Sequence, residues 1–154
     1  MPARRERQVG TGQVPRIVQV EVTSACQLHC TFCARTALAD RWITTHLAWE
    51  AFSALLPYAS RMELVHLQGW GEPLLHPRLW DMAAALKQAG CRVSLTTNAM
   101  LLDEEAAREA CRLGLDLVAV SLAGARPATN DSLRVGSSLQ RIATHVSYLC
   151  QQDP

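Results

Sequence analysis

The sequence predicts an α/β fold in which a parallel sheet is covered by helices. Four short apolar segments have strand character, and each is followed by a segment with apolar residues at helical spacing. The strands are expected at residues 17–22, 62–67, 92–96 and 115–120. Buried strands that alternate with helices are typical of parallel sheets joined by right-handed crossovers. The chain therefore contains about four βα units.

The expected helices begin and end at residues that favour helix termini. Three of them cover residues 47–56, 78–89 and 104–113, and a fourth begins at Ser137 or Ser138 and runs towards the C-terminus. Pro57 ends the first helix and Gly90 ends the second, because proline and glycine disfavour continuation. Asp103 caps the third helix, which Gly114 closes. Residues 126–136 lack any periodicity and are expected to form a loop.

The composition fits one domain without an obvious charged partner. The chain has 154 residues, 49% of them apolar, which is enough for a core. A formal net charge of +1 gives no basis for binding nucleic acid or a membrane surface. No apolar stretch approaches the roughly 20 residues of a membrane span. Residues 1–14, with their cluster Arg4-Arg5-Glu6-Arg7, are expected to form a disordered tail, and residues 15–154 the domain.

A cluster of cysteines directly follows the first expected strand. Cys26, Cys30 and Cys33 lie within eight positions, so one short loop can fold its thiolates around a single inorganic centre. Soft thiolates suit zinc or an iron–sulfur cluster. A cubane cluster held by three cysteines leaves one iron without a protein ligand, where chemistry can happen. The rival interpretation is a structural zinc site with His29 as its fourth ligand.

The other cysteines and histidines are expected to be structural or superficial. Cys91, Cys111 and Cys150 fall in regular segments, where cysteine acts as a small hydrophobe. This distribution indicates a reducing compartment, so we expect a cytoplasmic protein. His66 alternates with apolar residues on the second expected strand, and is expected to face the interior of the barrel in a structural role. Surface or loop positions are expected for His46, His76 and His145.

Each expected strand is followed by a loop with distinctive polar or small residues. The cysteines follow the first strand, and Gly69-Trp70-Gly71-Glu72-Pro73 follows the second. Thr97-Asn98 follows the third strand and Ser121-Leu122 the fourth. Ligands of such folds bind at the carboxyl ends of the strands. All four loops should therefore meet at one rim.

The order of these motifs resembles the radical S-adenosylmethionine (radical SAM) superfamily. The similarity lies in Cys26-x-x-x-Cys30-x-x-Cys33 with Phe32 before the last cysteine, and in the loops after the second, third and fourth strands. It extends from about residue 17 to the C-terminus. The resemblance implies a partial (β/α) TIM-like barrel with outer helices.

The resemblance also implies cofactors and a reaction. Cys26, Cys30 and Cys33 would ligate a [4Fe–4S] cluster whose fourth iron chelates S-adenosylmethionine. Reductive cleavage would give a 5′-deoxyadenosyl radical that abstracts hydrogen from an unknown substrate. An electron donor such as flavodoxin or ferredoxin would be needed, and a peptide or protein is one expected substrate. The cofactor contacts would come from Phe32, Trp70, Gly71, Glu72, Pro73, Thr97, Asn98 and Ser121.

Within that implied set, each residue has an expected role. Trp70 to Pro73 would lie against the methionine ammonium, and Phe32 near the adenine. Thr97, Asn98 and Ser121 would offer neutral hydrogen bonds to the carboxylate and the ribose. For Glu72 the alternative is a solvated loop carboxylate, and for the three neutral residues it is a role in ending strands and capping.

The chain departs from the family pattern in sequence and in length. Trp70 replaces a usual glycine, Ala99 stands where glycine is common after Thr-Asn, and Ala123 stands where aspartate is frequent. A complete barrel takes ~250 residues, so we expect a truncated product or a fragment of a longer enzyme. Two alternatives to a working core follow: an iron–sulfur-binding fragment without turnover, and a structural zinc protein.

Overall fold

A computed structural model describes residues 14–152 of the chain. The expected tail, apart from its last residue, lies outside the described residues. Val14 is half-buried and packs against the core, so the ordered domain includes the last residue of the expected tail. No helix in residues 14–152 is long and apolar enough to cross a membrane.

The predicted parallel sheet is confirmed. Its strands are β1 (Ile17–Val20), β3 (Leu64–Leu67), β4 (Arg92–Thr97) and β5 (Leu117–Val120). They are all parallel and lie in the order β1-β3-β4-β5, so each new strand is added beside the previous one. In this sheet β1 and β5 are the edge strands. Three of the expected strands are shortened at one end, and β4 gains Thr97.

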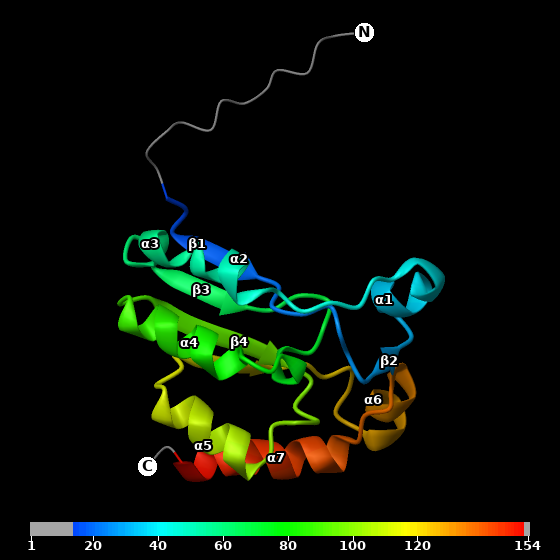
Figure 1. Ribbon diagram of the computed structural model, residues 1–154. Coiled ribbons are helices and arrows are strands. Elements are labelled where there is room, and N and C mark those ends of the chain that lie inside the picture. The colour runs from blue at the N-terminus through cyan, green and yellow to red at the C-terminus, as the bar shows by residue number, and fades with distance from the viewer. Residues whose placement is uncertain (1–13, 153–154) are drawn as a thin grey trace, which may run out of the picture.

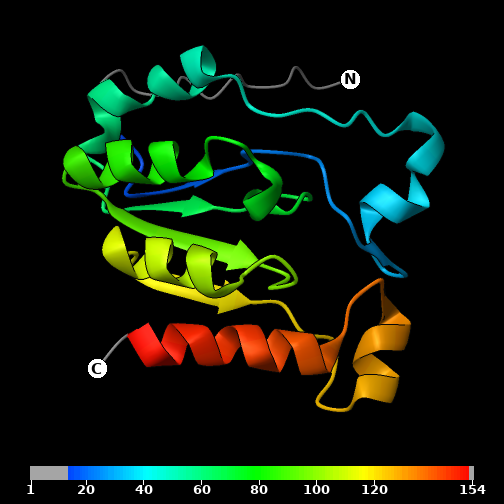
Figure 2. The ribbon, with the colours of Figure 1, turned by 60° about the horizontal axis from the view of Figure 1, so that its bottom comes forward.

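The helices of residues 14–152 are α1 (Ala34–Ala37), α2 (Trp49–Ser53), α3 (Leu56–Ala59), α4 (Leu79–Gln88), α5 (Glu104–Arg112), α6 (Pro127–Leu133) and α7 (Leu139–Gln152), with short 3-10 turns η1 (Ala39–Arg41) and η2 (Pro73–Leu75). Helices α2, α3, α4, α5 and α7 lie over one face of the sheet, whereas α1 and α6 lie beyond the carboxyl ends of its strands (Figures 1 and 2). The Asp103 carboxylate accepts a hydrogen bond from the Ala106 backbone at 3.0 Å, which confirms the predicted cap of α5. Gly114 follows α5 with φ +64°, a conformation that glycine adopts readily.

Two predictions about the helices are wrong. The helix expected over residues 47–56 is divided into α2 and α3. Pro57 does not end a helix but lies in the first turn of α3, where proline is tolerated. The segment 126–136, expected to be a loop, contains α6 and the two-residue strand β6 (Arg134–Val135). Strand β6 pairs antiparallel with β2 (His29–Cys30) of the cysteine loop.

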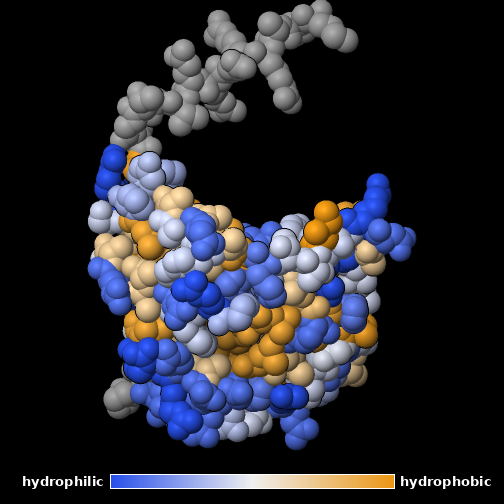
Figure 3. Space-filling model, viewed as in Figure 1, coloured by the Kyte–Doolittle hydropathy of each residue, from blue (hydrophilic) through white to orange (hydrophobic). Residues whose placement is uncertain are grey.

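The core lies between the sheet and the helices. Val65, Leu67, Val93 and Leu95 of the two central strands are at most 1% exposed and pack with Phe52, Met82 and Leu86 of the helices. A smaller cluster joins Ala99, Leu102 and Ile142 beneath α7. On the face of the molecule shown in Figure 3, apolar residues gather in one area that lies between hydrophilic areas. The opposite face of the sheet carries more polar side chains and bears no helix among the described elements.

Some side chains are more buried than a surface position allows. His76 lies in a loop, as expected, but is 6% exposed and bonds Leu47 O at 3.1 Å. His145 lies in α7, contrary to expectation, and is 7% exposed and bonds Ala99 O at 2.7 Å. Cys91 is buried as predicted, whereas Cys111 and Cys150 are exposed on the outer sides of α5 and α7.

Candidate functional site

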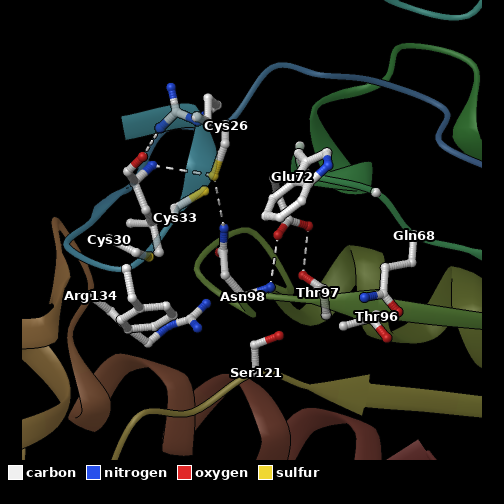
Figure 4. A pocket seen from close by; sticks show the side chains of 16 residues that line it. Cys26, Cys30, Cys33, Gln68, Glu72, Thr96, Thr97, Asn98, Ser121 and Arg134 are labelled. Atoms are coloured by element: carbon white, nitrogen blue, oxygen red, sulfur yellow. Dashed lines mark hydrogen bonds between the residues drawn. The ribbon is translucent and has the colours of Figure 1, made fainter. Parts of the chain in front are cut away.

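The loops at the carboxyl ends of the four strands meet around one pocket, as the sequence predicts (Figure 4). Side chains or backbone from all four loops line this pocket: Cys26, Leu28, Cys30, Phe32, Cys33, Arg35, Gln68, Gly69, Trp70, Gly71, Glu72, Thr96, Thr97, Asn98, Ser121 and Arg134. The meeting of these loops follows from the topology, because parallel strands present all their carboxyl ends at one edge.

The three cysteines of the loop after β1 all line the pocket as free thiols. Cys30 is buried, and Cys26 and Cys33 are half-buried. Asn98 Nδ2 lies 3.7 Å from Cys26 Sγ, and the Leu28 backbone N–H lies 3.5 Å from it. Burial raises the pKa of the Cys26 thiol, and the Leu28 contact opposes that rise. A bound metal would act against this rise, because it stabilises the thiolate form.

A short strap, defined as residues 133–136, holds the cysteine loop from the far end of the chain. The strap contains β6, which pairs with β2, and Leu133 O accepts a hydrogen bond from the Thr31 backbone at 2.9 Å. Asn130, fully buried, donates through its side-chain nitrogen to Ser137 Oγ at 3.1 Å. The position of the cysteine loop thus depends on residues about a hundred positions away.

Glu72 is buried at 2% exposure and joins two loops of the rim. Its carboxylate accepts hydrogen bonds from Thr97 Oγ1 at 2.6 Å, from the Asn98 backbone at 2.7 Å and from the Leu74 backbone at 3.2 Å. Burial raises the pKa of Glu72, and these hydrogen bonds act against the rise. The alternative of a solvated loop carboxylate is wrong, since the side chain lies inside the protein.

Gly71 brings the loop after β3 against the cysteine loop. A Cβ atom at this position would lie 2.1 Å from Thr23 O and 2.6 Å from Ala25 O, both backbone atoms. The neighbouring Glu72 backbone N–H donates to Ala25 O at 2.7 Å. The glycine is therefore required by close approach, and its φ is not in the left-handed region. At Gly69 a Cβ atom would meet the Glu21 side chain, with Cγ at 2.2 Å, so Glu21 would have to move.

The remaining predicted site residues are placed as follows. Phe32 and Trp70 line the pocket with 62% and 55% of their surface exposed. Ser121 also lines it, and its backbone N–H bonds Thr97 O at 2.9 Å. Pro73 is buried at the start of η2 and is not among the lining residues, so the structure does not bring it to the pocket. Ala99, the expected glycine position, adopts φ +60°.

Arg134 is a pocket residue that the sequence analysis missed. It is 8% exposed, it lines the pocket, and its Nε has no hydrogen-bond partner within residues 14–152. A buried guanidinium with an unsatisfied donor calls for an acceptor or an anion. It was missed because it lies in the segment that was expected to be a loop without structure.

The fold and the site define an α/β protein of the partial-barrel type with a three-thiol loop at the carboxyl ends of its strands. The chain belongs to the radical SAM superfamily, whose family model matches residues 20–152. The described fold agrees with this assignment, since the solved structures that it resembles are barrels, and the chain matches a part of each.

Relatives are found among enzymes with different substrates. The tungsten-containing aldehyde ferredoxin oxidoreductase cofactor-modifying protein of Pyrococcus furiosus is 31% identical over 110 residues, 70% of this chain and 30% of that protein. The PqqA peptide cyclase of Streptomyces rochei is 32% identical over 121 residues, 77% of this chain and 33% of the cyclase. The chain thus spans about a third of the length of these relatives.

Solved structures share the fold at low sequence identity. Streptococcus suis SuiB bound to the precursor peptide SuiA has a TM-score of 0.75 and 20% identity, over 90% of this chain and 31% of SuiB. The structure of anSMEcpe with bound AdoMet has a TM-score of 0.71 and 17% identity, over 90% of this chain and 41% of the other.

Proposed function

We propose that this chain is the part of a radical SAM enzyme core that holds a [4Fe–4S] cluster and S-adenosylmethionine. The observation that carries the proposal is the meeting of Cys26, Cys30 and Cys33 with the loops after β3, β4 and β5 around one pocket. When bound, the cluster and S-adenosylmethionine supply a 5′-deoxyadenosyl radical that abstracts a hydrogen atom from the substrate.

The donor set distinguishes a cluster from a structural zinc site. Three thiols line the pocket, which suits a cubane cluster with one iron left open, whereas a closed zinc site needs a fourth ligand. His29, the proposed fourth ligand of a zinc site, is exposed and does not line the pocket. The donor set therefore favours the cluster over zinc.

The pocket also offers groups suited to S-adenosylmethionine. Arg134, with its unsatisfied Nε, can bind the methionine carboxylate by charge-assisted hydrogen bonds. Ser121 and Asn98 offer neutral hydrogen-bonding side chains beside it, and the backbone of Trp70 and Gly71 faces the cysteine loop. Phe32 provides an aromatic surface for the adenine. Thr97 acts differently, because its hydroxyl is bonded to the Glu72 carboxylate and positions the loop.

The remaining partners are part of the same proposal. A flavodoxin or ferredoxin would supply the electron, and the free thiols suit a reducing compartment such as the cytoplasm. A peptide is the favoured substrate class, because a peptide cyclase is among the relatives and a peptide-bound enzyme shares the fold. A second candidate is a cluster-binding fragment without turnover.

Anaerobic reconstitution with iron and sulfide tests the proposal. We expect the wild-type chain to bind about four irons and four sulfides, and we expect Cys30→Ala to lose most of both. Cys91→Ala, at a buried cysteine outside the pocket, is the matched control and should keep them. Full iron content in Cys30→Ala would refute the assignment of ligands.

Addition of S-adenosylmethionine and dithionite separates the alternatives. A change in the EPR spectrum of the reduced cluster on adding S-adenosylmethionine, with formation of 5′-deoxyadenosine, supports an active core. An altered spectrum without 5′-deoxyadenosine supports the binding fragment. Colourless protein with stoichiometric zinc supports the structural zinc protein and contradicts both.

A further inference from the structure

The face of the sheet opposite the helices carries a row of polar side chains. In the register of the parallel strands, Gln19 of β1 lies beside His66 of β3, and His66 beside Ser94 of β4. One step nearer the rim follow Gln68 and Thr96, which line the pocket that the cysteines line. We define His66, Gln68, Ser94 and Thr96 as the polar wall. Its upper part is therefore continuous with the proposed cofactor pocket (Figure 4).

Hydrogen bonds fix the imidazole of His66 at the centre of the polar wall. Its Nδ1 lies 2.6 Å from Ser94 Oγ, and its Nε2 lies 2.6 Å from Gln68 Oε1 and 2.9 Å from Thr96 Oγ1. A carbonyl oxygen only accepts, so Nε2 carries the proton in the neutral ring and donates it towards Gln68. Nδ1 then accepts from the Ser94 hydroxyl, which is fully buried.

This arrangement leaves hydrogen-bond donors facing the pocket. With its oxygen held by His66, the Gln68 amide presents its NH₂ group, which has no acceptor within residues 14–152. Thr96 Oγ1 shares the Nε2 proton, so its own hydroxyl hydrogen is also without an acceptor in the described part of the chain. Both side chains are half-buried, so these two donors at the edge of the pocket are available to an acceptor on whatever binds there.

The charge beside the polar wall selects the kind of acceptor. Glu21 accepts a hydrogen bond from the Trp70 backbone at 2.6 Å, and its side chain lies against Gly69, next to Gln68 in the chain. The two cations that line the pocket lie at its other end, since Arg134 pairs with Cys30 and Arg35 bonds Leu28 O. At the end where Gln68 lies, the Glu21 carboxylate disfavours a second anion and offers an acceptor to an N–H group. A neutral amide, with a carbonyl oxygen and an N–H, satisfies both requirements.

We propose that the polar wall binds a neutral amide of the substrate, with the carbonyl oxygen on the Gln68 NH₂ and Thr96 hydroxyl groups. The proposal rests on the proposed function, because it takes the cofactor to occupy the rim and the substrate to lie beside it. The class of substrate that the wall accepts is thus amide-bearing and uncharged at the point of contact, as in a peptide backbone. Ser94 and His66 act as positioning residues, since they turn the Gln68 amide.

NMR titration of the full 154-residue chain tests this proposal. The probes are N-acetylglycine N-methylamide, which is neutral, and N-acetylglycine, which is an anion of similar size. We expect the neutral probe to shift the Gln68 side-chain NH₂ signal in a saturable way, with a dissociation constant at least tenfold lower than that of the anion. We expect ¹⁵N spectra to show His66 protonated on Nε2.

Three variants make the test specific. Gln68→Met removes the amide donors without adding charge, and should raise the dissociation constant of the neutral probe at least tenfold. Gln88→Met makes the same change at an exposed position of α4, and should leave probe binding as in wild type. Ser94→Ala should weaken the probe several-fold and give a mixture of His66 tautomers, a change that simple loss of stability does not produce.

The outcomes that overturn the proposal differ from those that overturn the proposed function. Equal binding of the anion, unchanged binding in Gln68→Met, no saturable binding, or displacement of the probe by S-adenosylmethionine would each refute the amide site. The last result would assign the polar wall to the cofactor. Failure to assemble a cluster or to bind S-adenosylmethionine is measured separately, by iron content and by EPR, and would refute the proposed function.

Discussion

Gly71→Ala is the substitution that most directly tests how the rim is assembled. The added Cβ would lie 2.1 Å from Thr23 O and 2.6 Å from Ala25 O. Ordinary contacts of a Cβ with backbone oxygen are more than 3 Å long, so about an ångström of backbone displacement is needed. No side-chain rotation can relieve the contact, because both neighbouring atoms belong to the main chain.

The expected cost has two parts. Forcing an extra methyl group into a packed site costs about 1–3 kcal/mol. Moving the loop also breaks the 2.7 Å hydrogen bond from the Glu72 backbone to Ala25 O, for about another 1 kcal/mol. The sum is about 2–4 kcal/mol, which lowers the melting temperature of a chain of this length by roughly 5–15 °C. Since Ala25 precedes Cys26, the displacement should also loosen the cysteine loop.

Thermal unfolding followed by circular dichroism measures the first effect, and the rate of iron loss to a chelator measures the second. Gly90→Ala is the control, since its Cβ would meet no atom within 4 Å and only the left-handed φ of +83° opposes it, at a cost of about 1 kcal/mol. Equal melting temperatures in the two variants, or unchanged iron retention in Gly71→Ala, would refute the close-approach argument.

Three further predictions concern pH and loop position. Burial lowers the pKa of His76, so its contribution to folding stability is fully present above the ordinary pKa of 6.5 and falls as pH decreases below it. In urea unfolding, the stability of His76→Gln should therefore fall less with decreasing pH than that of the wild type. Burial acts to raise the pKa of Asp116, but hydrogen bonds and the charges of nearby basic groups lower it overall. Its contribution is therefore lost as pH falls through the lowered pKa. Asp116→Asn should destabilise the protein more at pH 7 than in acid, and Asp81→Asn, at an exposed carboxylate, should be near neutral at both. Gly136→Ala, with φ +93° and a Cβ 3.3 Å from Leu28, should cost about 1–2 kcal/mol and speed iron loss from the cysteine loop.

The parallel sheet and the rim follow from patterns that a sequence displays locally. The apolar runs that become β1, β3, β4 and β5 are short and are separated by helical segments, so strand order and direction follow from the crossover rule. The loops after each strand must then lie at one edge. For this reason the meeting of Cys26, Glu72, Asn98 and Ser121 was predictable without knowledge of any contact.

The elements that the sequence did not reveal are those that depend on distant partners. The segment Pro127–Leu133 contains Thr, Asn, Asp and Ser, which are poor helix formers, so its propensity favours a loop. It becomes α6 because Asn130 is fully buried and binds the Ala123 backbone at 3.0 Å and Ser137 at 3.1 Å. The burial of His76 and His145 was not predicted for the same reason, since the carbonyls that they bond lie far away in sequence.

Glu72 has a structural task in addition to the one predicted for it. The prediction that its carboxylate lies near the methionine ammonium stays a prediction. In the structure the side chain lines the pocket from inside the rim and accepts hydrogen bonds from Thr97 and from the Asn98 backbone. Asn98 in turn contacts Cys26 Sγ at 3.7 Å. One buried carboxylate therefore fixes the loop after β4 relative to the loop after β3, while Gly71 fixes the latter against the cysteine loop. Because a buried carboxylate without its donors costs several kcal/mol, these loops cannot separate independently, and the geometry of the rim is set before any cofactor binds.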